Sequence, residues 1–181
     1  MITHTEQSIQ SRNQPASCFK QAAGTSLTFH PGDDALIKEA ESDTNFGYMP
    51  NLNAKYGVGS RVDSLMKFAL DCQYTDSIVS RAVLKLYCKN GAPRGGKLIT
   101  VFGTWAEDAV TWNNAPFSPT QFYEQIGRVR QERWVEIDVT SAITSMEGDE
   151  VTFRIEGSHS NAAVYSSKEE DMYAPILEIF F

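Results

Sequence analysis

Short runs of alternating apolar and polar residues fill the chain from about residue 26 to its end. In residues 26–30, 51–55, 61–70 and 78–88, every second side chain is apolar over most of the run. A period of two with one apolar side is typical of a half-buried antiparallel strand. By the same reasoning, further strands are predicted at residues 35–40, 97–102, 134–139, 151–155, 162–166 and 176–181.

Turn residues separate these runs, as in Pro31-Gly-Asp-Asp34. Many short strands divided by turns are typical of an all-β sandwich or barrel. The one helical signal is a short turn after Asp138-Val-Thr140, which disfavours the α/β folds that bind nucleotides. We predict an all-β fold, a jelly-roll β-sandwich of two antiparallel sheets, over residues 25–181. Residues 1–24 are polar and show neither period, so they are predicted to form a flexible tail.

The charge and the hydropathy of the chain disfavour some classes of function. The formal net charge is -7 at pH 7, which disfavours a binder of nucleic acid or of anionic membranes, because those partners need a basic face. No apolar run approaches the ~20 residues of a membrane helix. The first residues lack the basic segment and apolar run of a signal peptide. We expect either an intracellular protein or a module of a longer secreted one, and favour the second.

Neither cysteines nor carboxylates form a recognised metal motif. Cys18, Cys72 and Cys88 lack zinc-site spacing. Cys72 and Cys88 bracket one strand–turn–strand region and either pair or remain separate thiols. Carboxylates cluster near the predicted start of the fold, where a solvated acidic loop is favoured over a structural calcium, an ion that takes six to eight oxygens. These carboxylates are Asp33, Asp34, Glu39, Glu41 and Asp43.

The segment from Trp105 to Pro116 is the most distinctive part of the chain. It reads Trp-Ala-Glu-Asp-Ala-Val-Thr-Trp-Asn-Asn-Ala-Pro. Its tryptophans either form a sugar-stacking platform or attach a long loop to the sandwich, burying a large area and donating an indole N–H. We favour attachment. Asn113 and Asn114 are then expected to hydrogen-bond backbone in the turn before Pro116.

This segment resembles the disaggregatase-related DNRLRE domains and the similar family 96 carbohydrate-binding modules. Other pieces fit in the same order: Phe29 to Ala35, Asn45-Phe-Gly47, Arg61, Leu65-Met-Lys-Phe68, Ala82 to Tyr87, Asp138-Val-Thr140, Ser167-Lys-Glu169 and Pro175-Ile-Leu177. The resemblance implies a jelly-roll sandwich that works outside the cell and binds polysaccharide, with alginate the best-known type. The resemblance also implies that such modules are usually appended to polysaccharide-degrading or cell-wall proteins, which allows an appended catalytic domain in a full-length protein.

Basic residues provide a candidate binding face. They are expected on the outward side of their strands, and would share one face if those strands lie in one sheet. Arg there would grip carboxylates with a bidentate fork and Lys would act as a point charge. A solvated face whose charges prevent edge pairing is the alternative, and the resemblance favours binding for Arg61 and Lys67. The candidates are Lys55, Arg61, Lys67, Arg81, Lys85 and Lys168, the last of which could instead pair with Glu169.

We therefore predict a non-catalytic module that binds an acidic, alginate-like polysaccharide. A structural or adhesion domain of an extracellular protein is the alternative. A polysaccharide lyase is a weaker one, since the chain lacks the common nucleophile, phosphate-loop and zinc-protease motifs. Such a lyase would need Tyr with His or Arg to remove the proton alpha to a uronate carboxyl. Tyr87, Tyr165 and His159 are the residues available for that role.

Overall fold

The predicted sandwich of two antiparallel sheets is confirmed. The computed structural model describes residues 23–70, 78–117, 122–146 and 148–181. Sheet A has the order β1 (Ser26–Phe29), β11 (Ile176–Phe180), β5 (Arg81–Asn90), β10 (Ala163–Ser166) and β3 (Asn51–Ala54), with β8 (Arg133–Asp138) paired to β5. Sheet B has the order β2 (Asp33–Lys38), β4 (Val62–Ala69), β9 (Glu150–Glu156), β6 (Gly96–Val101) and β7 (Tyr123–Ile126).

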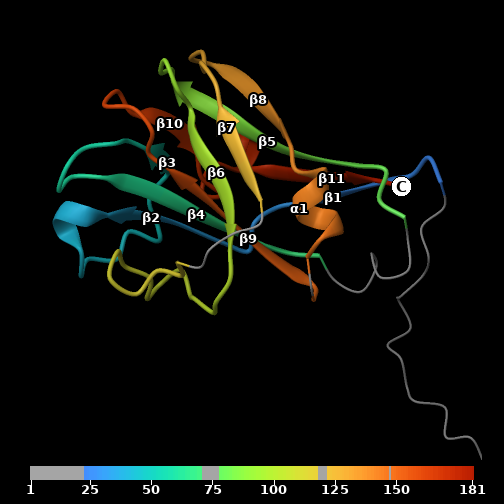
Figure 1. Ribbon diagram of the computed structural model, residues 1–181, viewed down its shortest axis with the longest axis horizontal. Helices are drawn as coiled ribbons and strands as arrows, with labels where there is room; N and C mark the ends of the chain where they lie inside the picture. Colours follow the sequence, from blue (N-terminus) through green and yellow to red (C-terminus); the bar gives the residue numbers. More distant parts are fainter. Residues whose placement is uncertain (1–22, 71–77, 118–121, 147) are drawn as a thin grey trace, which may run out of the picture.

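The core lies between the two sheets, which Figure 1 shows stacked on one another. Alternate residues of the central strands fill it, including Met66 and Phe68 of β4 and Leu84 and Leu86 of β5, all fully buried. Each such side chain contributes roughly 1.5–3 kcal/mol by leaving water. Since the residues of this main core recur at every second position of β4 and β5, the period of two in the sequence identified both the strands and their inward sides.

The outer side of sheet B is also covered. Residues 102–117, here called the covering loop, run along it and are drawn in yellow tones beside β2 and β4 (Figure 1). Trp105 and Val110 of this loop pack on Ile37, Leu65 and Ile99, which forms a second apolar cluster. Leu65 is therefore buried although it points away from the main core.

A few details differ from the prediction. Strand β7 was missed, because only Ile126 of its residues is buried and the sequence shows no alternation there. Strand β2 begins at Asp33, inside the predicted turn. The short helical turn is α1 (Thr140–Thr144), and 3-10 turns η1 (Glu39–Glu41) and η3 (Asp171–Tyr173) complete the elements. No helix in the described part of the chain is long and apolar enough to cross a membrane.

The structure shows the state of only one of the three cysteines. Cys88 is a buried free thiol whose S–H donates to the Asn90 carbonyl at 3.3 Å. Burial raises the pKa of this thiol, which keeps it protonated and unreactive. Cys18 and Cys72 lie outside the described residues, as does nearly all of the predicted tail.

Candidate functional site

The predicted cations do not share one face. Arg61 and Lys67 belong to sheet B, because β4 pairs with β2 and β9. Arg81 and Lys85 belong to sheet A, because β5 pairs with β11, β10 and β8. Lys55 follows β3 and forms an isolated bridge with Val62. The basic residues could share one face only if their strands lay in one sheet, and the strands do not. Sequence periodicity gives the inward side of each strand but not the strands with which it pairs.

Arg61 belongs to a largely buried network centred on Asp63. Its Nε donates to Asp63 Oδ1 at 2.9 Å, and its guanidinium also lies 3.1 Å from Glu156 Oε1. Arg154 donates to Asp63 Oδ2 at 3.0 and 2.6 Å, and the Gly157 N–H donates to Oδ1 at 2.8 Å. Asp63 is fully buried and Arg154 is 5% exposed. Both arginines therefore neutralise carboxylates of the protein itself.

Three of the candidate lysines are also paired with carboxylates. Lys67 forms an ion pair with Asp33 and donates to the Trp105 carbonyl at 2.8 Å. Lys168 lies 3.1 Å from Glu107 Oε2 and 2.7 Å from Glu169 Oε1. Lys85 is paired with Glu178 at 2.7 Å and with Glu136 at 3.9 Å. Ion pairs of this kind reduce the attraction of a lysine for an external anion.

The covering loop confirms the structural interpretation of Trp105. This residue is 9% exposed, and its indole N–H donates to Thr152 Oγ1 at 3.1 Å. Asn45 holds the loop by donating to the carbonyls of Glu107 and Val110, both at 2.7 Å. A Cβ at Gly47 would overlap the Glu107 carbonyl, so only glycine allows this approach. The distinctive segment and its Asn45-Phe-Gly47 companion therefore build one structural unit.

The two asparagines of the covering loop act differently. Asn114 bonds backbone as predicted, accepting from the Thr111 N–H at 2.7 Å and donating to the Ala109 carbonyl at 3.0 Å. The Asn113 side chain instead donates to Asp43 Oδ1 at 2.8 Å and to Ser42 Oγ at 3.2 Å. The prediction for the Asn113 side chain is wrong, because these partners approach from a segment distant in sequence.

Asp34 should make stability depend on pH. It is buried, its Oδ2 accepts from the Lys168 N–H at 2.6 Å, and its Oδ1 lacks a partner among the described residues. The pKa of Asp34 is raised to about 7, mainly by burial. The hydrogen bond from the Lys168 amide lowers this pKa, and the negative charge of Glu107 raises it further. An unfolded Asp ionises near pH 3.9, so between about pH 4 and 7 only the folded state keeps the proton, and stability falls as pH rises through this window.

The test of this pH dependence is Asp34→Asn, which keeps an acceptor for the Lys168 amide but cannot ionise. We expect the variant to gain stability relative to the wild-type protein as pH rises from about 5 to about 8. Denaturant unfolding of both proteins at the two pH values measures this change. An unchanged difference in unfolding free energy would contradict the role given to Asp34.

The acidic residues near the start of the fold each have a partner within the protein. Asp33 pairs with Lys67, Glu41 with Lys38, and Glu39 accepts from the Arg61 N–H at 3.0 Å. In the described ranges, no group of three or more His, Cys, Asp or Glu side chains is arranged to hold a metal ion. Calcium binding stays a prediction that these contacts do not support.

The two tyrosines named for a lyase lie on opposite sides of sheet A. Tyr165 is fully buried in the core, where its hydroxyl donates to the Gly95 carbonyl at 2.8 Å. Burial raises the pKa of Tyr165 far above its ordinary value. Tyr87 alternates with the buried Leu86 and Cys88 and so lies on the opposite side of sheet A. Tyr165 therefore cannot act with Tyr87 on one substrate.

The outer side of sheet A carries a partly exposed aromatic cluster. The Tyr87 ring stacks on Tyr173 of η3, with centroids 4.0 Å apart and planes at 22°. Trp134 of β8 is the cross-strand partner of Tyr87 and meets it edge to face at 5.5 Å. Trp134 remains 40% exposed, and Met172 next to the cluster is 79% exposed. The pKa of Tyr87 is raised, mainly by desolvation and next by the nearby Tyr173, so its hydroxyl stays neutral.

Sequence reasoning missed this cluster. From the sequence, Tyr87 was only a lyase candidate, and nothing in the sequence linked it to Trp134 or Tyr173. Partly exposed aromatic rings of this kind provide an apolar surface with a polar edge. Such a surface can stack on the apolar faces of sugar rings while the Tyr hydroxyls bond to sugar hydroxyls. The aromatic cluster, defined as Tyr87, Trp134 and Tyr173, is therefore the main candidate binding surface.

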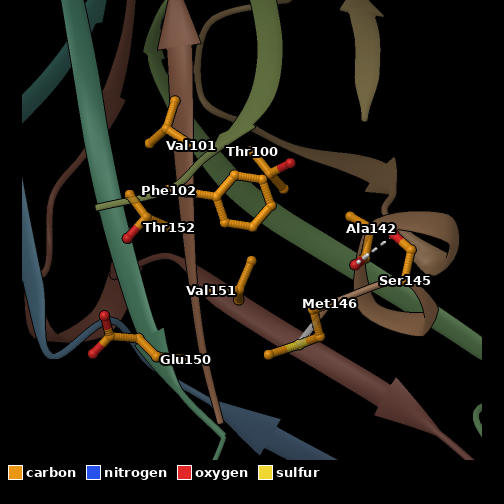
Figure 2. Close-up of a pocket in the computed structure, with 9 residues that line it drawn as sticks. All are labelled: Thr100, Val101, Phe102, Ala142, Ser145, Met146, Glu150, Val151 and Thr152. Atoms are coloured by element: carbon orange, nitrogen blue, oxygen red, sulfur yellow. Dashed lines mark hydrogen bonds between the residues drawn. The ribbon is translucent and has the colours of Figure 1, made fainter. Parts of the chain in front are cut away.

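A separate pocket of about 360 Å³ lies between β6, β9 and α1 (Figure 2). Figure 2 shows the Phe102 ring among the lining residues, with Val151 next to it and with Met146 and Glu150 farther away on opposite sides. The described residues that line it include a carboxylate but no cationic side chain. An acidic ligand would therefore be repelled there.

Comparison with known proteins identifies the family. A search of curated proteins finds no match. The model of carbohydrate-binding module family 96 matches residues 25–181, a range that includes both sheets, the covering loop and the aromatic cluster. The chain therefore belongs to carbohydrate-binding module family 96.

Proposed function

We propose that this domain binds an acidic, alginate-like polysaccharide on the outer side of sheet A. Members of this family bind carbohydrate and are non-catalytic in themselves. The observation that carries the proposal is the partly exposed aromatic cluster. It lies on the outer side of a sheet, whereas the outer side of sheet B is packed against the covering loop.

The surroundings of the cluster supply polar contacts. Lys85 and Lys89 lie two residues before and after Tyr87 in β5 and share its side of the sheet. Their ammonium groups lie 2.7 Å from Glu178 and 2.9 Å from Glu170. Arg81, on the same side, lies over the Phe180 ring at 6.0 Å. A sugar chain on the cluster would find aromatic faces flanked by donors and acceptors, the mixture common in ligand sites.

The acidic class of ligand rests on the resemblance of the motif, which implies alginate-type polymers. Lys85 and Lys89 border the stacking surface, but Glu178 and Glu170 pair with them, so they supply polar contacts rather than free positive charge. Extracellular use and attachment to a polysaccharide-degrading enzyme are part of the same proposal. Because charged contacts are screened by salt, binding of the acidic polymer should weaken as ionic strength rises.

Trp134→Ala is expected to weaken polysaccharide binding about 30-fold. The substitution removes the most exposed ring of the cluster, and a central aromatic contact commonly contributes about 2 kcal/mol or more. Calorimetry with alginate oligosaccharides measures the change, with polygalacturonate and a neutral glucan as further ligands. Tyr123→Ala is the matched control, because Tyr123 is an exposed aromatic residue of β7 in the other sheet.

Two results would overturn the proposal. If the wild-type protein binds no glycan, the adhesion interpretation gains support. If Trp134→Ala binds alginate as tightly as wild type while retaining its fold by circular dichroism, the binding surface lies elsewhere. In that case Lys55, Arg61, Lys67 and Lys168 would be the next positions to test.

A further inference from the structure

We propose that a polar pocket at the end of β5 and β8 is an anion subsite for the carboxylate or sulfate groups of a polysaccharide. This inference rests on the proposed function and names the part of the site that selects an acidic chain. The pocket has a volume of about 550 Å³ and lies between the β5–β6 connection, the segment before β8, and the residue Asn161. Its polar lining comprises Asn90, Gly91, Arg128, Arg130, Gln131 and Asn161.

The first argument is the state of its arginines. Arg128 and Arg130 are exposed, and neither has a carboxylate partner in the part of the chain that the structure describes. Several other cations of the protein are paired with carboxylates, as with Arg61, Lys85 and Lys168. Two unpaired guanidinium groups on one pocket attract an anion from solution, and each offers a planar fork that matches a carboxylate or a sulfate.

The second argument is local concentration. Arg94 and Arg133 flank the same connection and segment, and no carboxylate pairs with either among the described residues. The chain as a whole is acidic, with a formal net charge of -7. Positive charge gathered at one place on an acidic protein repels itself unless an anion is bound. This distribution therefore favours an anionic ligand.

The third argument is how the backbone builds the pocket. Ala92 and Val129 form an isolated antiparallel bridge, with N–H to carbonyl distances of 3.2 and 3.0 Å. Val129 is buried, and Arg128 and Arg130 on either side of it are exposed and line the same pocket. A Cβ at Gly91 would lie 2.8 Å from the Val129 carbonyl oxygen, so glycine is needed for this close approach. The backbone that carries Arg128 and Arg130 is thus fixed at Val129 by this bridge.

The pocket lies beyond one end of the aromatic cluster along the same strands. Asn90 is three residues after Tyr87 in β5, which is about 10 Å at the rise of a strand. Arg130 is four residues before Trp134, the cross-strand partner of Tyr87. A polysaccharide that stacks on the cluster and follows β5 would bring its next acidic groups to the arginines. Stacking then supplies binding that depends little on charge, and the pocket supplies preference for acidic chains.

The test compares acidic and neutral ligands on arginine variants. For the double variant Arg128→Ala/Arg130→Ala, we expect binding of alginate oligosaccharides to weaken by at least about 10-fold for each guanidinium group removed. Oligosaccharides whose carboxyl groups have been chemically reduced should bind the double variant and the wild-type protein with the same affinity. Arg128→Lys/Arg130→Lys keeps the charge but loses the fork, and should bind alginate with intermediate affinity. A sulfated galactan, titrated in parallel, separates sulfate from carboxylate as the preferred group.

The control is Lys38→Ala/Lys97→Ala, which removes the same charge from half-buried, ion-paired positions of sheet B. Alginate affinity lowered equally by the control and by the arginine variant would overturn the pocket and indicate a general charge effect. Unchanged alginate binding in the arginine variant, together with weakened binding in Trp134→Ala, would overturn the pocket but leave the proposed function standing. Absence of binding by the wild-type protein would overturn both.

Discussion

Asp63→Ala is expected to lower the free energy of unfolding by about 3–5 kcal/mol. The fully buried Asp63 carboxylate accepts from Arg61, Arg154 and the Gly157 backbone. Removing it leaves the Arg154 guanidinium, which is 5% exposed, without its main counter-charge. An unpaired buried charge costs far more than the lost hydrogen bonds themselves. Denaturant unfolding of the two proteins measures the difference.

A double variant separates the two contributions. Asp63→Ala/Arg154→Met removes the carboxylate and the buried charge together, so its loss should be smaller than the sum of the two single losses. Glu41→Ala breaks the exposed Lys38–Glu41 pair and should change stability by less than about 1 kcal/mol. A cost of that same size for Asp63→Ala would show that the network contributes no more than a surface ion pair.

Because of the same network, a charge reversal at Arg61 would not test sugar binding alone. Arg61→Glu would place a third carboxylate beside those of Asp63 and Glu156. Repulsion among them would destabilise the fold. A loss of polysaccharide binding in this variant would therefore report on folding as well as on a sugar contact, so Trp134 and the pocket arginines are better probes.

Trp105→Ala is expected to lower the free energy of unfolding by about 3–5 kcal/mol, the range for truncating a large buried aromatic residue. Trp105 packs against Leu65 and Ile99 and fastens the covering loop to sheet B. Its removal should free the loop, so hydrogen exchange should speed up at the Val110 and Ala115 amides, which bond within the loop. Sugar binding on sheet A should persist under conditions where the variant stays folded.

Trp105→Phe is the matched control for this loop. It keeps most of the apolar contact and loses the bond to Thr152 Oγ1. We expect a cost of about 1–3 kcal/mol, the penalty for leaving a buried hydroxyl without its partner plus a small cavity. If Trp105→Ala loses sugar binding while the protein remains folded and the loop remains protected from exchange, the platform interpretation of Trp105 would be restored.

The sequence by itself determined the strands, the two-sheet sandwich and the structural role of the Trp105 segment. Period-two alternation records which side of each strand meets the core, as in Met66 and Phe68, because burial acts on each residue locally. The edge strand β7 was missed for the same reason, since it buries one residue of four.

Only the tertiary structure decided where the cations go and what they meet. Strand order placed Arg61 and Lys85 on different sheets, and partners distant in sequence, such as Asp63 with Arg154, neutralised them. It also brought together Tyr87 and Tyr173, which are far apart in the chain. A charge or a ring acts through its neighbours in space, and those neighbours are set by strand pairing, which the pattern along one strand does not encode.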